Sequence, residues 1–151
     1  MRRIEGFPLW IGNARDAQDI KGVLDAGIEA VVDLAIMSEP LRPPRELVYL
    51  RFPLVDGGDN PPWLICAAVQ AVGGLIREKV PTLVACDGGM SRSVAIVAAA
   101  ITPVNESPDE ALRRVSECGL ADVHPALWAD VRQYLASDTI RPPRSVRFVD
   151  G

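Results

Sequence analysis

The sequence has little of what disulfide frameworks, metal sites and membrane spans are built from. Its 151 residues include one histidine and three cysteines, Cys66, Cys86 and Cys118, which form no CxxC pair. An odd cysteine count without paired spacing argues against a disulfide framework or a zinc site and favours a reducing compartment. No stretch approaches the roughly 20 apolar residues of a membrane helix, and no signal-peptide pattern follows the basic N-terminus. We therefore expect a cytoplasmic protein that uses no metal or other cofactor.

Net positive charge is also lacking. The formal net charge is −4 at pH 7 and the pI is about 5.0, which gives no global reason to bind nucleic acid or an anionic membrane. Hydrophobic residues make up 48% and charged residues 24% of the chain, as in an ordinary globular protein. The length fits one domain, which we expect over residues 1–140, followed by a tail over residues 141–151. Any basic binding site must be local.

Patterns typical of strands and helices alternate along the chain. We expect strands at 9–12, 30–35, 47–54 and 81–85, and helices at 13–26, 63–79, 92–101, 107–118 and 125–136. Asn13 is a suitable cap for the first helix, and Gly27 a suitable end. Gly73 and Gly74 lower the helix propensity of their segment, which predicts close packing there. This order predicts a single-domain α/β fold with a central, mainly parallel β-sheet flanked by helices.

The segment that carries candidate chemistry runs from Cys86 to Ser93 and has the sequence CDGGMSRS. Between a strand and a helix, a glycine-rich turn points successive backbone N–H groups into one concavity, and the helix N-terminus adds positive potential. This environment should favour the thiolate of Cys86. Arg92 can present a planar fork to two phosphate oxygens. Such a set suits attack on a phosphate monoester, although a lone buried cysteine is more often a packing residue.

This segment resembles the C-x5-R-S signature of cysteine-dependent protein phosphatases, in the CxxGxSRS form of the dual-specificity branch. Residues 8–35 look like that branch's opening strand, helix and strand, and residues 107–136 look like its two closing helices. The resemblance implies a dual-specificity-phosphatase-like fold. It also implies a phosphomonoester hydrolase that acts through a phosphocysteine intermediate and needs no metal.

The resemblance also implies a role for each matching residue. Cys86 would be the nucleophile, Arg92 would bind the phosphoryl group, and Ser93 would assist the departing thiolate. The phosphate cradle would be formed by the backbone amides of Asp87, Gly88, Gly89, Met90, Ser91 and Arg92. In the family, the general acid is an aspartate about 30 residues before the cysteine, which Asp56 matches and for which Asp59 is the alternative. The implied partner is a phosphorylated protein or a small phosphomonoester.

Two residues depart from the family pattern. The family's histidine before the nucleophile is replaced by Ala85, and Asp87 adds a negative charge directly after it; both predict a less favoured thiolate. The absence of lysine from the segment favours a phosphoprotein or small phosphomonoester over an inositol lipid or an RNA 5′-triphosphate. Two alternatives stay open: a catalytically weak relative that binds phosphorylated partners, and a sulfur-transfer or arsenate-type cysteine enzyme.

Three other residues attract attention. We expect His124 at the surface or as the cap of the last helix, and Cys66 and Cys118 as packing residues. Either cysteine could protect an oxidised Cys86 by forming a disulfide.

Overall fold

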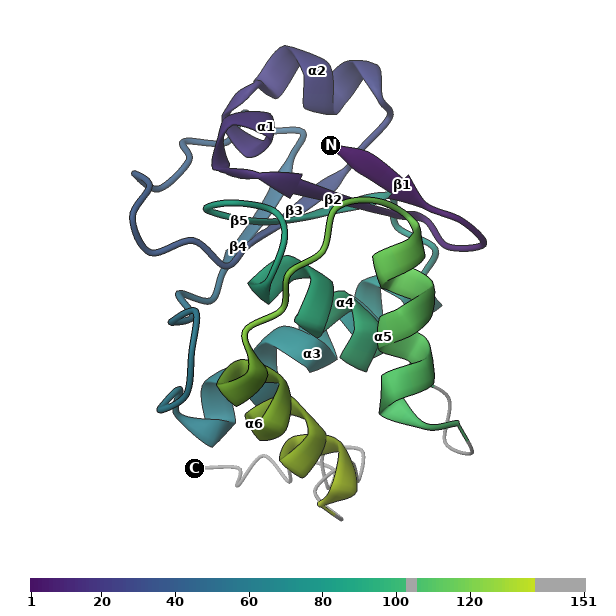
Figure 1. Ribbon diagram of the computed structural model, residues 1–151. Coiled ribbons are helices and arrows are strands. Elements are labelled where there is room, and N and C mark those ends of the chain that lie inside the picture. Colours follow the sequence, from purple (N-terminus) through teal and green to yellow (C-terminus); the bar gives the residue numbers. More distant parts are fainter. Residues whose placement is uncertain (103–105, 138–151) are drawn as a thin grey trace, which may run out of the picture.

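A five-stranded sheet separates two layers of helices in the computed structural model, which describes residues 1–102 and 106–137 (Figure 1). In chain order the elements are β1 (Arg2–Ile4), β2 (Leu9–Asn13), α1 (Ala14–Gln18), α2 (Ile20–Asp25), β3 (Ala30–Asp33), β4 (Val48–Arg51), α3 (Pro62–Arg77), β5 (Thr82–Cys86), α4 (Arg92–Ile101), α5 (Pro108–Glu117) and α6 (Pro125–Ala136). Helices α1 and α2 lie on one face of the sheet, and α3 to α6 lie on the other. No helix in this part of the chain is long and apolar enough to cross a membrane.

The strand order is β1-β2-β5-β3-β4, with parallel pairing from β2 to β4 and an antiparallel pairing of β1 with β2. The predicted α/β fold with a mainly parallel sheet is therefore confirmed. Strand β1 was not predicted, because two of its three residues are arginines and it has no apolar alternation. The carboxyl ends of the parallel strands meet at one edge, where ligand sites of open α/β sheets form.

Strand β5 places the candidate nucleophile at the centre of the sheet. Val84 and Cys86 pack toward α3 to α6, while Leu83 and Ala85 pack toward α1 and α2, as strand alternation requires. Helix α4 is buried along almost its whole length, in agreement with its continuous apolar sequence. Both ends of the candidate loop are therefore fixed in the core.

Two sequence predictions were wrong in detail. The expected helix over residues 13–26 is divided at Asp19, whose ψ of 74° leaves the helical region and whose carboxylate accepts from Gly22 N–H to cap α2. Asn13 does cap α1, in a reciprocal capping box with Asp16.

The second wrong prediction concerns Gly73 of α3. A Cβ on Gly73 would meet only the Arg77 side chain, at 3.6 Å, so close packing is not the reason for that glycine. The expected tail, 141–151, lies outside the described residues.

Both tyrosines of the chain should titrate abnormally. Burial and a hydrogen bond to Asp33 raise the pKa of Tyr49 to about 12, and burial and Cys66 raise the pKa of Tyr134 to about 12. We expect the tyrosinate absorbance of the folded protein to show no step near pH 10, where tyrosines of the unfolded chain titrate. Because both folded pKa values are raised, the associated stability is complete below about pH 10 and is lost as the pH approaches about 12. A step near pH 10 in the folded protein would contradict this.

Candidate active site

The turn between β5 and α4, residues 86–92, is here called the cysteine loop. Its outward carbonyls are held by backbone donors from other segments: Ala14 N–H donates to Asp87 O at 3.5 Å, and Asp122 N–H donates to Met90 O at 2.9 Å. In a turn of this kind the N–H groups face the side opposite to the carbonyls. The bonds on the outside of the loop therefore help to keep its amides directed inward.

Gly89 occupies a position that only glycine fits. Its φ is +71°, and a Cβ would lie 2.9 Å from the backbone of Gly12. Its N–H donates to Cys86 Sγ at 3.2 Å. The tight turn thus brings one backbone donor directly to the sulfur.

Cys86 has only 1% of its surface exposed and lies at the base of the loop. Its Sγ is 3.3 Å from the hydroxyl oxygen of the fully buried Ser93. Ser93 is in the first turn of α4, so the helix holds its hydroxyl next to the sulfur. Two polar donors therefore surround an atom that could carry negative charge.

Arg92 is held in place by bonds within the chain. Its side chain is 8% exposed, and Nη1 donates to Leu54 O at 3.0 Å and pairs with Asp87 Oδ2 at 2.7 Å. Its buried Nε has no hydrogen-bond partner among the described residues. A buried guanidinium N–H without an acceptor is costly, and a bound oxyanion would satisfy it.

The carboxylate of Asp87 is engaged with the segment that follows β3. It accepts from Ile36 N–H, Met37 N–H and the Ser38 hydroxyl, in addition to its pairing with Arg92. Burial alone would raise the pKa of Asp87, but these hydrogen bonds lower the pKa below its usual value. The charge of Asp87 is therefore paired with Arg92 and with donors after β3, while its predicted effect on the thiolate stays a prediction.

Asp56 is docked on the cysteine loop. Ser91 donates its hydroxyl hydrogen to Asp56 Oδ1 at 2.5 Å, and the same hydroxyl oxygen accepts from His124 N–H at 2.9 Å. Ser91 is the N-cap residue of α4, yet its side chain makes no capping bond to the helix. The hydroxyl is thus used to position Asp56, and the first amides of α4 keep their donors for a ligand.

The loop that carries Asp56 is braced by Asn60, a residue that sequence analysis missed. The Asn60 side chain accepts from Val55 N–H at 2.8 Å and donates to Val55 O at 2.9 Å and to Gly57 O. Asp59 instead lines a separate cavity of about 560 Å³, together with Trp63 and Cys66. The structure therefore brings Asp56 to the cysteine loop and does not show such a contact for Asp59.

Arg2 is a second residue near the site that sequence analysis missed. Its Nη1 donates to Gly89 O at 3.2 Å and its Nη2 to Leu120 O at 2.7 Å. The sequence offered no signal for this contact, because 87 positions separate Arg2 from Gly89.

The side chain of His124 accepts from Ala126 N–H and so caps α6, which was one of the two roles expected for this residue. Cys66 and Cys118 are partly buried, free thiols.

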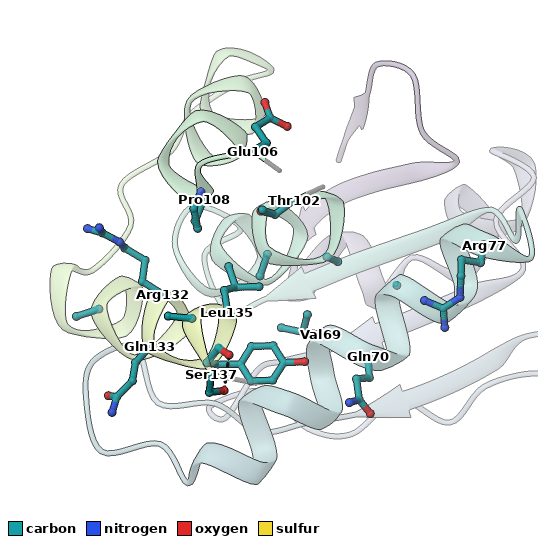
Figure 2. A pocket seen from close by; sticks show the side chains of 16 residues that line it. Val69, Gln70, Arg77, Thr102, Glu106, Pro108, Arg132, Gln133, Leu135 and Ser137 are labelled. Atoms are coloured by element: carbon teal, nitrogen blue, oxygen red, sulfur yellow. Dashed lines mark hydrogen bonds between the residues drawn. The ribbon is translucent and has the colours of Figure 1, made fainter. Parts of the chain in front are cut away.

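A groove of about 1070 Å³ lies away from this site, among α3, α4 and α6. Figure 2 shows Val69, Gln70 and Arg77 along α3 and Leu135 of α6 across from Val69, while the Arg132 side chain points away from them. None of the predicted site residues lines this groove. Nor does the described part of the chain hold a group of three or more His, Cys, Asp or Glu side chains that could bind a metal.

Solved structures with a similar fold include phosphatases and a phosphatase-like protein. A mouse protein assigned to the dual specificity phosphatases, in complex with zinc tungstate, is 27% identical, with 88% of this chain and 84% of that chain covered and a TM-score of 0.75. Human DUSP28 is 22% identical, with coverages of 89% and 95% and a TM-score of 0.77. The human tyrosine phosphatase-like serine/threonine/tyrosine-interacting protein is 20% identical, with coverages of 89% and 94% and a TM-score of 0.74. No family model and no curated protein sequence matches the chain.

Proposed function

Because the chain has the fold of the dual-specificity phosphatases, as its sequence predicted, we propose that it hydrolyses phosphate monoesters with Cys86 as the nucleophile. The observation that carries this proposal is the set of groups that the cysteine loop and the start of α4 hold together: Gly89 N–H donates to Cys86 Sγ, the Ser93 hydroxyl lies 3.3 Å from that sulfur, and the guanidinium of Arg92 is held by Leu54 O. A tetrahedral oxyanion would satisfy these donors and lie against the sulfur.

In the first step the Cys86 thiolate would attack phosphorus and form an S–P bond while the P–O bond to the leaving group breaks. Asp56 would give its proton to the leaving oxygen, so that an alcohol rather than an alkoxide departs. Its hydrogen bond to Ser91 supports this role, because the bond fixes the carboxyl group beside the loop. Arg92 and the loop amides would stabilise the charge on the three equatorial phosphoryl oxygens.

In the second step water would attack the phosphocysteine and release inorganic phosphate. Asp56, now a carboxylate, would take a proton from the water, and the S–P bond would break to regenerate the Cys86 thiolate. The Ser93 hydroxyl, 3.3 Å from the sulfur, would donate a hydrogen bond to that leaving thiolate. Each step transfers one phosphoryl group and one proton and needs no redox partner.

The surroundings of the loop favour a phosphorylated protein or a small aryl phosphate as the substrate. Met90 is in the loop, the amides of Ile36 and Met37 bind Asp87, and the side chains of all three are exposed. Such a rim suits an apolar leaving group better than a polyanionic one. Arg92 is the only basic residue of the cysteine loop.

The test is hydrolysis of p-nitrophenyl phosphate under reducing conditions by the wild type and by Cys86→Ser. We expect turnover by the wild type and its loss in Cys86→Ser, because the alcohol is a far weaker nucleophile than a thiolate. Cys66→Ser and Cys118→Ser make the same chemical change elsewhere and should retain turnover. Equal activity of wild type and Cys86→Ser would overturn the proposal.

A second candidate is a phosphate-binding relative with little turnover. Ala85 favours it, since no polar side chain precedes the nucleophile, and a phosphatase-like protein is among the structures of similar fold. It predicts no hydrolysis by the folded wild type but binding of tungstate or vanadate that Arg92→Ala abolishes. A sulfur-transfer enzyme would instead form a persulfide on Cys86 with thiosulfate.

A further inference from the structure

Arg2 lies on the same face of the sheet as Cys86, although it belongs to the edge strand β1. Arg2 pairs with Ile11 of β2, and Ile11 in turn pairs with Val84 of β5. Ile11, Val84 and Cys86 all pack into the core on the α3 to α6 side. The guanidinium of Arg2 therefore extends from the sheet edge beneath the cysteine loop.

The fork of Arg2 joins two backbone segments near the site. Nη1 binds the Gly89 carbonyl of the cysteine loop, and Nη2 binds the Leu120 carbonyl of the segment between α5 and α6. Because Gly89 O and the next amide, Met90 N–H, belong to one peptide plane and point in opposite directions, holding the carbonyl outward turns that amide inward. Arg2 thus acts on the orientation of a cradle donor.

The rest of the molecule leaves room for this side chain. A Cβ on Gly119 would lie 2.2 Å from Arg2 Cδ, so glycine at this position admits the arginine stem. The Nε of Arg2 is buried and has no hydrogen-bond partner among the described residues. Burial lowers the pKa of Arg2, and negative charge on Cys118 and Cys86 counteracts that effect. Arg2 is connected to the Cys86 sulfur through Gly89, whose carbonyl accepts from Arg2 Nη1 at 3.2 Å and whose N–H donates to Cys86 Sγ at 3.2 Å.

Arg2 differs from the other charged groups near Cys86 in the partners that it binds. Arg92 is paired with Asp87, and Asp56 is bound by Ser91. Ala85 faces the opposite side of the sheet, in an apolar cluster, and brings no charge. Arg2 makes both of its hydrogen bonds to neutral carbonyls, so its positive charge is not neutralised by a carboxylate in those contacts.

We propose that Arg2 is a positioning residue of the cysteine loop, which holds the Gly89 carbonyl outward and supplies a positive charge that stabilises the Cys86 thiolate. Its effect on turnover rests on the proposed phosphatase function, whereas its effect on the thiolate does not. The inference therefore has a test that needs no catalysis.

The test is the rate at which iodoacetamide alkylates Cys86, resolved from Cys66 and Cys118 by peptide mass spectrometry. Arg2→Gln removes the charge and shortens the side chain, so that its amide does not reach Gly89 O as Nη1 does, whereas Arg2→Lys keeps the charge but loses the fork. Arg3→Gln is the matched control, because Arg3 is exposed on the opposite face of the same strand, over the Trp10 ring. Melting temperature verifies that each variant is folded, and Cys66 serves as the internal reference.

We expect Arg2→Gln to lower the alkylation rate at about pH 6.5, relative to the rate at about pH 9.5, by about threefold to tenfold. Arg2→Lys and Arg3→Gln should each stay within about twofold of the wild-type ratio. A purely structural role would change the rate at both pH values and leave the ratio intact. An unchanged ratio in Arg2→Gln, or an equal fall in Arg3→Gln, would overturn the inference.

Two further outcomes separate this inference from the proposed function. Should Arg2→Gln fail to fold, a fall in the ratio of about threefold or more for folded Arg2→Lys would refute the role of charge. A lowered ratio in Arg2→Gln together with no hydrolysis by the wild type would refute the phosphatase function and support the inference. Hydrolysis by the wild type together with an unchanged alkylation ratio in Arg2→Gln would support the phosphatase function and refute the inference about Arg2.

Discussion

Replacement of Arg92 by lysine is expected to lower kcat/KM for p-nitrophenyl phosphate by about a thousandfold, the scale of losing a transition-state donor. Lysine keeps the charge but has a single ammonium group, which cannot bind Leu54 O and Asp87 and also present a second donor to phosphate. The variant should also bind tungstate much more weakly. Both results follow from the loss of the planar guanidinium that Leu54 O and Asp87 orient.

The matched control for this variant is Arg51→Lys. Arg51 ends the edge strand β4 and also donates to a backbone carbonyl, Ala35 O, at 3.4 Å. Its hydrogen bond and its ion pair go to Ala35 and Asp33 rather than to the cysteine loop, and we expect its lysine variant to keep kcat/KM within about twofold. Retention of activity within tenfold by a folded Arg92→Lys would contradict the assigned role of the arginine.

Asp56→Asn should lower kcat by about a hundredfold and remove the fall in rate on the alkaline side of the pH profile. The amide has the same shape and can still accept from the Ser91 hydroxyl, so the loop should stay in place and tungstate affinity should be retained. The loss should grow from p-nitrophenyl phosphate to phenyl phosphate, because the poorer leaving group depends more on protonation. The measurement is kcat against pH for both esters.

Asp59→Asn provides the control in the same loop. Asp59 has a φ of +69°, a region that asparagine tolerates as well as aspartate does. If Asp56 is the acid, Asp59→Asn keeps the wild-type profile. A normal profile in Asp56→Asn and a flattened one in Asp59→Asn would transfer the role to Asp59.

The sequence was sufficient for the parts of the site that are contiguous in the chain. Cys86, Gly89, Arg92 and Ser93 share one strand-turn-helix segment, so local geometry alone places them together. Neighbouring residues were also sufficient to predict helix α4 and the capping of α1 by Asn13. Their chemical roles, and that of Asp56, stay predictions.

Contacts between distant segments could not be predicted in this way. Arg2 reaches Gly89 only because β1 pairs with β2 and β2 with β5, an order that no short pattern encodes. The pairing of Asp87 likewise depends on the segment after β3. Asp19 was missed for another reason: a side chain that can cap a helix also competes with the helix in progress.

The bonds that hold Arg92 have a consequence for the affinity of the site for oxyanions. An unrestrained arginine side chain gives up about 2 kcal/mol of rotamer entropy when it is fixed. Here bonds to Leu54 O and Asp87 within the chain fix the guanidinium, so folding itself orders this side chain. An arriving oxyanion meets a preorganised fork, and its affinity is not reduced by the ordering of this side chain.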